Sequence, residues 1–410
     1  MTTEAPGRAA RLARAVLVPR ATYQAAVLRI GLAAVIAAFL LREWPHRRVL
    51  YGDRSPLSYD LALTLIQEEG TFSVLGWWGG RLWLEIVYTV TVLAALAVMA
   101  GWRTRATAVL LMVGLVSLEN RNPLVGDGGD NILRIMVIYL VLTRCAQVWS
   151  LDARRARRAR RSAGDGAGPR DPVGVALWAV LGALLFWAFG FPPPVGWPLA
   201  LWLLWAVQGL WYVVNRAPGA REPRSVLDGC AAMAHNAGMV VIGAQVCLIY
   251  ATAGWYKIQG TRWQEGSALY YALHLDYFTP WPWLSAALAG NALLVLALTY
   301  LTVAVQVAFP FTLANRRLKN VLLAVMIAEH VGIAVLLGIP FLSLVMIVCD
   351  LVFLPTSFLT RLGAWCARLT RRGRSAPMAP SGRSGPSVSA GSGGGPGRPP
   401  AATAEPTPVG

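Results

Sequence analysis

The first long apolar stretch of the chain, residues 22–41, reads TYQAAVLRIGLAAVIAAFLL. A helix of about 20 residues rises about 30 Å, which is the thickness of the hydrocarbon core of a bilayer. Similar runs recur as far as residue 358, and in the 410-residue chain hydrophobic residues make up 56% while charged residues make up only 14%. The sequence therefore predicts an all-α protein, a polytopic bundle of transmembrane helices.

The apolar runs, together with the Pro, Gly and Arg residues that interrupt them, predict about ten transmembrane helices. Run 22–41 resembles a signal peptide, but it is long for one, carries Arg29 and lacks a convincing cleavage site, so we interpret it as the first span. The predicted spans are 22–41, 82–100, 106–118, 132–150, 174–191, 195–214, 236–256, 284–309, 319–338 and 341–358.

The basic residues predict the orientation of the bundle. The net charge is +17, yet the charges fall in short segments between apolar runs, so we expect no nucleic-acid partner and regard the lipid bilayer as the first partner. With the N-terminus inside, 26 Lys and Arg residues fall on the inner side and 8 on the outer side. This asymmetry predicts that both termini are inside. The Arg-, Ala-, Gly- and Pro-rich composition is typical of high-GC coding and favours a bacterial inner membrane.

Charge and composition divide the chain into three parts. Residues 1–21 form a basic cytoplasmic N-terminus, and 22–358 form the transmembrane domain, which is interrupted by an Arg-rich cytoplasmic linker at 151–173. Residues 359–410 are first basic and then rich in Pro, Gly and Ser, so we expect a disordered cytoplasmic tail from 375. The five cysteines are scattered without a C-x-x-C pair, which indicates neither a zinc site nor a disulfide framework.

Polar residues inside the apolar runs are candidates for function, because each is costly in lipid unless it is paired or used. Arg29 lies in the first span, where it either reaches the inner surface or pairs with a carboxylate of the bundle. His330 lies near the middle of the ninth span and is more typical of a hydrogen-bonding partner than of a metal ligand. The other three histidines share no ligand spacing with His330, so we predict no metal site.

A Gly- and Asp-rich segment joins the third and fourth spans on the predicted outer side. Its carboxylates could bind a cation, but Asp130 and Arg134 are four residues apart on the next helix and could form an ion pair instead. Asp130 and Asn131 could also cap that helix. We retain Asn122, Asp130, Asn131 and Arg134 as candidate substrate-binding residues.

The densest group of polar and aromatic residues begins in the seventh span. Tyr250, Ala253, Gly254 and Lys257 fall on one face of a helix, and the small residues allow another helix to approach closely. At the outer end of this face, a partly desolvated Lys257 could act as a base or as an electrostatic clamp, or it could simply reach the membrane surface among aromatic residues. The aromatic segment 270–283 predicts an amphipathic helix on the outer surface.

These residues resemble the HTTM (horizontally transferred transmembrane) family, the membrane domain shared with vitamin K-dependent γ-glutamyl carboxylase. The matching pieces run in the family's order over roughly residues 20–358. They are Asn120-Arg121-Asn122-Pro123, Asp130-Asn131, Trp149-Ser150-Leu151-Asp152, Gln245 with Tyr250-x-x-Ala253-Gly254-x-x-Lys257, Trp263-x-x-Gly266-x-Ala268, and His330 with Phe341, Ser343 and Leu344.

The resemblance implies a chemistry for Lys257. In the carboxylase, a lysine of the middle motif is the base that deprotonates reduced vitamin K, so Lys257 becomes a candidate catalytic base and a reduced quinone a candidate cofactor. Tyr250, Trp263 and His330 join the candidate substrate-binding residues. The chain lacks the family's Asn-His pair before the fourth span, where it has Gly129-Asp130-Asn131, and it lacks the carboxylase's large extracytoplasmic domain. We therefore do not expect full peptide carboxylation.

Three functions remain open at this stage. The chain could be an enzyme acting at the outer leaflet on a quinone or a secreted peptide. It could be a non-enzymatic partner in the maturation or export of a small secreted antimicrobial peptide, as for the related sporulation-delaying-protein B type. It could also be a transporter, although no repeat of the kind that transporters carry is evident. No P-loop, dinucleotide-binding motif or nucleophile elbow is present in the sequence.

Overall fold

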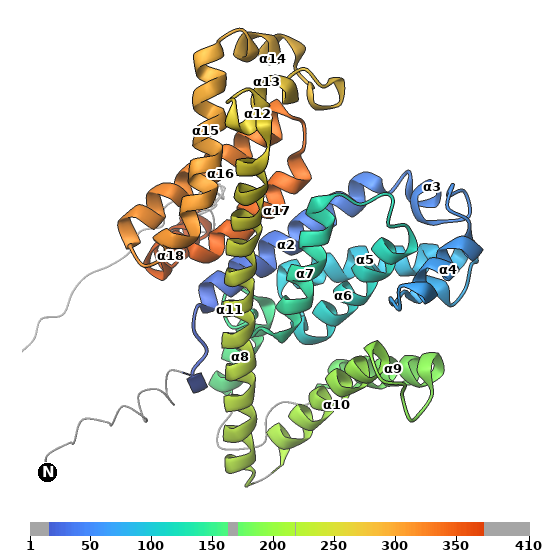
Figure 1. The fold of residues 1–410 in the computed structure, drawn as a ribbon. Coiled ribbons are helices and arrows are strands. Elements are labelled where there is room, and N and C mark those ends of the chain that lie inside the picture. Colours follow the sequence, from blue (N-terminus) through green and yellow to red (C-terminus); the bar gives the residue numbers. More distant parts are fainter. Residues whose placement is uncertain (1–15, 163–170, 218, 373–410) are drawn as a thin grey trace, which may run out of the picture. The chain divides into compact units, whose positions relative to one another are not determined.

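The computed structural model describes residues 16–162, 171–217 and 219–372, and all of the regular structure in these ranges is helical (Figure 1). The chain divides into two compact units, Met1–Leu362 and Gly363–Gly410. The α-helices are α2 (Thr22–Glu43), α3 (Arg47–Tyr51), α4 (Tyr59–Glu68), α5 (Arg81–Ala100), α6 (Thr104–Arg121), α7 (Gly128–Leu142), α8 (Leu151–Ser162), α9 (Pro172–Phe189), α10 (Trp197–Arg216), α11 (Arg221–Gln259), α12 (Thr261–Gln264), α13 (Ala268–Ala272), α14 (Pro282–Ala289), α15 (Ala292–Ala308), α16 (Arg316–Leu336), α17 (Pro340–Asp350) and α18 (Thr356–Arg372). Four 3-10 helices join them, η1 (Val74–Gly76), η2 (Asp276–Phe278), η3 (Phe309–Thr312) and η4 (Leu351–Phe353).

Helix α2 lies at the centre of the first unit's core. It packs against α5, α7 and α17, and Figure 1 shows α2, α5, α6 and α7 lying side by side. Leu28, Leu32 and Ile36 of α2 are fully buried in these contacts. A Cβ atom at Gly31 would lie 2.6 Å from Cγ1 of Val348, so only glycine lets α2 approach α17 this closely.

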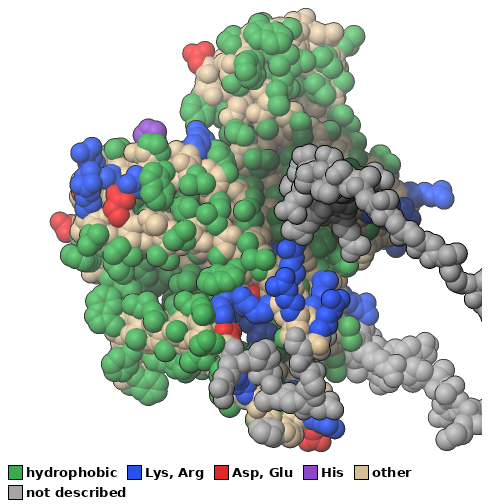
Figure 2. Space-filling model, turned by 180° about the vertical axis from the view of Figure 1, so that it is seen from behind, with side chains coloured by type: hydrophobic (Ala, Val, Ile, Leu, Met, Phe, Trp, Pro, Cys, Tyr) green, Lys and Arg blue, Asp and Glu red, His purple; other side chains and the backbone are tan. Residues whose placement is uncertain are grey.

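In the described ranges, seven helices are long and apolar enough to cross a membrane, or eight if the bent pair of α17 and α18 is one span. This confirms the predicted helical class and indicates a multi-pass membrane protein. Hydrophobic side chains also spread over much of the face seen in Figure 2, a surface suited to lipid rather than water. The seven segments are Thr22–Glu43, Arg81–Ala100, Pro172–Phe189, Trp197–Arg216, Arg221–Gln259, Ala292–Thr312 and Arg316–Leu336.

The remaining predicted spans take other forms. Segment 106–118 lies within α6, and segment 132–150 forms α7 only as far as Leu142, where Thr143 turns to an extended backbone conformation. Segment 341–358 is divided between α17 and α18, because Pro355 stands at the junction and the residue before a proline disfavours helical geometry.

Helix α11 is longer than its predicted span, 236–256. Its 39 residues rise about 58 Å, roughly twice the hydrocarbon thickness. In Figure 1 it is one continuous helix, and it contacts α7 and α10 along one part and α12 and α15 along another. One helix thus contacts different neighbours at different points along its length.

Two predictions about the connecting segments need correction or restriction. The amphipathic helix predicted at 270–283 is wrong: this segment is divided into the end of α13, η2 and the start of α14. Pro280 lies in the break between η2 and α14, and Pro282 is the first residue of α14, a position that favours proline. In the Arg-rich linker, residues 151–162 form α8, while 163–170 lie outside the described residues. The tail predicted to be disordered, 375–410, lies outside them as well.

Arg29 is held in a way that neither sequence interpretation anticipated. Its side chain is fully buried, and it donates hydrogen bonds to four backbone carbonyls rather than to a carboxylate or to the surface. The acceptors are the carbonyl oxygens of Val98 (2.5 Å), Met99 (2.7 Å), Cys145 (3.2 Å) and Trp149 (2.7 Å). The guanidinium therefore ties α2 to the last turn of α5 and to the loop after α7.

Candidate functional site

Lys257 lies in the last turn of α11, and its partner is a glutamine of another helix. Its Nζ donates a 2.8 Å hydrogen bond to Oε1 of Gln306 on α15. The amide of Gln306 then donates from Nε2 to Oε1 of Glu329 on α16, at 2.6 Å. Because Gln306 is only 4% exposed, its amide forms a buried bridge between an amine and a carboxyl group.

Small residues allow these helices to approach each other, as the sequence predicted. A Cβ atom at Gly254 would lie 2.6 Å from Cγ2 of Val307, so α11 and α15 pass at a distance that only glycine permits. Gly254 precedes Lys257 by one turn and Val307 follows Gln306. This close approach therefore brings the lysine and the glutamine within hydrogen-bonding distance.

A second polar group lies on α11 about two turns before Lys257. The hydroxyl of Tyr250 lies 3.0 Å from Nε2 of His330 and donates to the carboxylate of Asp350, 3.0 Å from each oxygen. All three residues are buried: Tyr250 is 2% exposed, His330 6% and Asp350 0%. The other ring nitrogen of His330, Nδ1, is buried and has no hydrogen-bond partner among the described residues.

The two groups are joined in sequence because Glu329 and His330 are neighbours on α16. We refer to Tyr250, Lys257, Gln306, Glu329, His330 and Asp350 as the membrane polar cluster. It draws on α11 and on α15, α16 and α17, and its residues span about 100 positions of the chain from Tyr250 to Asp350. The predicted residues Tyr250, Lys257 and His330 all belong to it, and the ring of Trp263 lies 5.2 Å from Nζ of Lys257.

Sequence reasoning did not select Gln306 or Asp350. Both are polar residues inside predicted spans, 284–309 and 341–358, and the rule that selected His330 applies to them equally. Asp350 in particular is a fully buried carboxylate at the end of α17. Asp350 could have been selected as a carboxylate inside an apolar run, but nothing in the sequence placed it opposite Tyr250.

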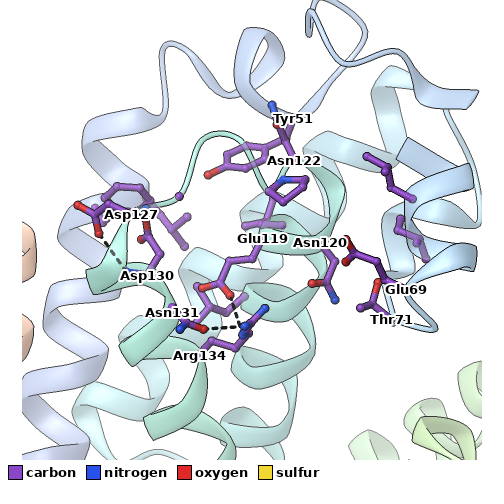
Figure 3. A pocket seen from close by; sticks show the side chains of 18 residues that line it. Tyr51, Glu69, Thr71, Glu119, Asn120, Asn122, Asp127, Asp130, Asn131 and Arg134 are labelled. Atoms are coloured by element: carbon purple, nitrogen blue, oxygen red, sulfur yellow. Dashed lines mark hydrogen bonds and ion pairs between the residues drawn. The ribbon is translucent and has the colours of Figure 1, made fainter. Parts of the chain in front are cut away.

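The other predicted residues lie together elsewhere, around a cavity of about 450 Å³ (Figure 3). Asn122, Asp130, Asn131 and Arg134 line it together with Glu119. Figure 3 shows Arg134 between Glu119 and Asn131: its guanidinium lies 3.6 Å from the Glu119 carboxylate and donates a 2.6 Å hydrogen bond to Asn131. Burial raises the pKa of Glu119, which follows the predicted third span, to about 8.

The predicted ion pair between Asp130 and Arg134 is wrong, since Arg134 pairs with Glu119. Asp130 instead takes part in a capping box at the start of α7, where its carboxylate accepts from the backbone N–H of Asp127 at 2.8 Å. Asp127 is the capping residue, three positions before the predicted Asp130. Local hydrogen bonds thus hold Asp130 in the first turn of α7.

Asn122 has a structural environment. It is 5% exposed, and its side-chain amide donates to the backbone carbonyl of Leu50 at 2.7 Å. The side-chain oxygen of Asn122 accepts from the backbone N–H of Leu124. In the described part of the chain, no hydrogen bond or ion pair joins the 450 Å³ cavity to the membrane polar cluster. The eight predicted site residues therefore fall into two groups.

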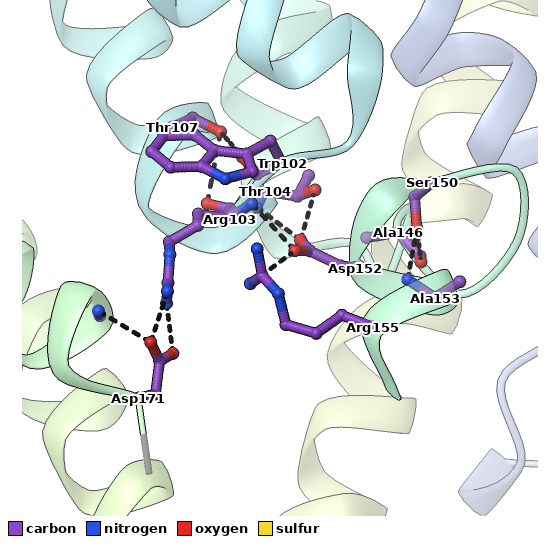
Figure 4. A network of polar contacts seen from close by, with 11 residues as sticks. Trp102, Arg103, Thr104, Thr107, Ala146, Ser150, Asp152, Ala153, Arg155 and Asp171 are labelled. Atoms are coloured by element: carbon purple, nitrogen blue, oxygen red, sulfur yellow. Dashed lines mark hydrogen bonds and ion pairs between the residues drawn. The ribbon is translucent and has the colours of Figure 1, made fainter. Parts of the chain in front are cut away.

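The segment Trp149-Ser150-Leu151-Asp152 holds helix ends together. Figure 4 shows that Asp152 accepts hydrogen bonds from the backbone N–H groups of Arg103 (2.9 Å) and Thr104 (2.8 Å), at the start of α6. The guanidinium of Arg103 pairs with both carboxylate oxygens of Asp171, and this pairing lowers the pKa of Asp171. These contacts are structural and connect α6, α8 and α9.

No cluster of three or more His, Cys, Asp or Glu side chains suited to a metal ion occurs in the ranges that the structure describes. The membrane polar cluster offers an amine, two carboxyl groups, an imidazole and a phenol, all of which can take part in acid–base chemistry. Compared with known proteins, the chain matches no family, no curated protein and no solved structure.

Proposed function

We propose that the chain is an inner-membrane protein of the HTTM type that carries out proton transfer with Lys257 as base. The observation that supports this most directly is the bridge from Lys257 through Gln306 to Glu329. The two hydrogen bonds of the amide are compatible with an ion pair and with two neutral groups, so the amine and the carboxyl group can together hold one exchangeable proton on either side. In the neutral form Lys257 is free to accept a proton from a substrate.

The substrate class follows from the position of Lys257 at one end of a membrane-spanning helix. A substrate reaching this position is either lipid-soluble or presented at the membrane surface, such as a quinone or a small secreted peptide. A reduced quinone is the proton donor that the resemblance implies. The ring of Trp263 beside Lys257 offers an aromatic surface on which such a ring could pack.

Substitution of Lys257 by arginine tests this function. Arginine keeps the positive charge but does not release its proton, so Lys257→Arg should lose function while its protein level remains normal. Lys257→Ala should lose function as well. Lys319, the other lysine of the chain, provides a matched control: its Nζ donates to the carbonyl of Phe353, and Lys319→Arg should retain function. The measurement is complementation of a deletion strain, with membrane levels checked by immunoblot.

Full complementation by Lys257→Arg would mean that Lys257 is not a base and would leave a role for its positive charge alone. Loss of protein from the membrane in this variant would be recognised by immunoblot before activity is compared. A third variant, Gln306→Leu, breaks the bridge while keeping Lys257, and it should reduce function without abolishing insertion.

We also propose a topology with both termini inside and about ten crossings, which would place Lys257 on the extracytoplasmic side. The support is the distribution of the basic residues, 26 on the inner side against 8 on the outer side. A reporter active only in the cytoplasm should give signal when fused after Arg161 or Arg374, and none after Gln264. Signal after Gln264 would reverse the orientation and make the lysine face the cytoplasm.

A further inference from the structure

A second and smaller cavity lies beside the 450 Å³ cavity, and Tyr51 forms part of the wall of both. Its volume is about 250 Å³. The segment between α2 and α5 forms most of its wall, and Arg121, the last residue of α6, completes it. We refer to this space as the Arg121 cavity.

Arg121 is a buried guanidinium without a counter-charge. The residue is 4% exposed, and its Nη2 donates to the carbonyl oxygens of Leu57 at 3.2 Å and Gly52 at 3.5 Å. Its Nη1 is buried and has no hydrogen-bond partner in the described ranges, and no carboxylate there forms an ion pair with it. A buried charge left in this state requires an anion, because protein interiors solvate charge poorly.

The start of α5 contributes a second, independent feature to the same cavity. Gly79, Gly80 and Arg81 line it, and Gly80 is an N-cap without a side-chain hydrogen bond. The backbone N–H groups of Arg81 and Leu82 therefore have no capping partner within the described chain. The N-terminus of a 20-residue helix carries partial positive charge and unpaired donors, which favour an anion.

The charges around the Arg121 cavity leave it positive. Asp53 is the only carboxylate among the described lining residues, and Arg48 holds it through two hydrogen bonds, from Nε at 3.0 Å and from Nη2 at 2.5 Å. This contact keeps the pKa of Asp53 below its ordinary value. Asp53 is therefore committed to Arg48, and neither Arg81 nor Arg121 forms an ion pair with any described carboxylate.

We propose that the Arg121 cavity binds a phosphate group, held by Arg121, Arg81 and the N-terminus of α5. A phosphate presents three or four acceptor oxygens, which match two guanidinium groups and a pair of backbone N–H groups better than the two oxygens of a carboxylate do. The phosphate belongs either to the headgroup of an anionic phospholipid or to a soluble phosphate compound. The site is independent of Lys257 and of the chemistry proposed there.

Two binding measurements on the purified full-length protein test the site and distinguish the sources. In delipidated detergent micelles, inorganic phosphate is titrated by calorimetry, with acetate at equal ionic strength as the carboxylate probe. In nanodiscs of phosphatidylcholine with and without phosphatidylglycerol, native mass spectrometry counts the lipids that remain bound. Arg81→Gln and Arg121→Gln remove the two charged donors. Arg54→Gln makes the same charge change in the same segment outside the cavity.

We expect saturable binding of inorganic phosphate or of phosphatidylglycerol that weakens about tenfold or more in Arg81→Gln and is unchanged in Arg54→Gln. Binding of inorganic phosphate in micelles identifies a soluble ligand, whereas retention of phosphatidylglycerol alone identifies a lipid. The proposal is overturned if neither probe binds, if acetate binds as tightly as phosphate, or if Arg81→Gln binds like wild type. Because Arg81 is exposed, its variant carries the test even where Arg121→Gln fails to fold.

Discussion

Replacing Arg29 with methionine is expected to prevent the protein from folding stably. The side chain is fully buried and donates to four carbonyl oxygens. Its loss leaves those of Met99, Cys145 and Trp149 without a hydrogen-bond partner in the described ranges, while that of Val98 keeps the backbone N–H of Gly101. An unsatisfied buried polar group costs about 1–3 kcal/mol, and the sum approaches the total stability of a typical domain. Thermal unfolding in detergent should show a large loss or no folded protein.

Arg42 on the same helix provides the matched control. Its side chain is 62% exposed, pairs with the adjacent Glu43 and lies 5.1 Å from the ring of Phe341. Exposed contacts of this kind contribute up to about 1 kcal/mol, so Arg42→Met should have a small effect. Arg29→Lys keeps the charge, but its single nitrogen cannot reach four carbonyls, so this variant should lie between the two. If Arg29→Met unfolds at the same temperature as Arg42→Met, the four carbonyl contacts do not stabilise the protein.

Removing Lys257 should destabilise the protein through Glu329, although the two side chains do not touch. In Lys257→Met the carboxyl of Glu329 remains bonded to Gln306 but loses the only cation in its bridge, and breaking a buried pair in this way costs about 3 kcal/mol. Glu329→Gln should show a similar but smaller loss. The loss in the free energy of unfolding of the double variant should be at least about 1 kcal/mol smaller than the sum of the two single losses. When both groups are removed, no buried charge remains without its partner.

Thermal or denaturant unfolding of the four proteins in one detergent gives this coupling energy. Additive losses would mean that Gln306 does not couple the two groups, and the shared proton in the proposed function would lose its basis. Tyr250→Phe provides a useful comparison, since it changes the neighbouring hydrogen bonds to His330 and Asp350 and leaves the Lys257 bridge intact.

The sequence predicted local features of this protein more successfully than it predicted partners. Apolar run length is a local property, and it was enough to identify the helical class and the seven long apolar helices of the described ranges. The face shared by Tyr250, Gly254 and Lys257 depends only on the helical period, and Gly254 does contact another helix where expected. Both predictions needed no knowledge of which helices become neighbours.

Partners across helices required the tertiary structure. Arg134 could be matched with Asp130 by helical spacing, but Glu119 on the neighbouring helix α6 reaches it instead. Likewise Gln306 and Asp350 were visible as polar residues in apolar runs, yet only the packing of α15 and α17 beside α11 makes them partners of Lys257 and Tyr250. One sequence gives helical spacing but not the order in which helices pack.

Because α11 is one continuous helix, a small change in its tilt at one point displaces residues far along it by a larger distance. In the N-terminal half of α11, His235 lies between two backbone groups, the N–H of Arg144 and the carbonyl of Arg20, within hydrogen-bonding distance of each. Lys257 is 22 residues further along the same helix, a distance of about 33 Å. A tilt of about 5° around His235 would therefore displace Lys257 by about 3 Å, the full length of its hydrogen bond to Gln306. A small change of tilt near His235 would therefore be enough to make or break the bridge at the far end of α11.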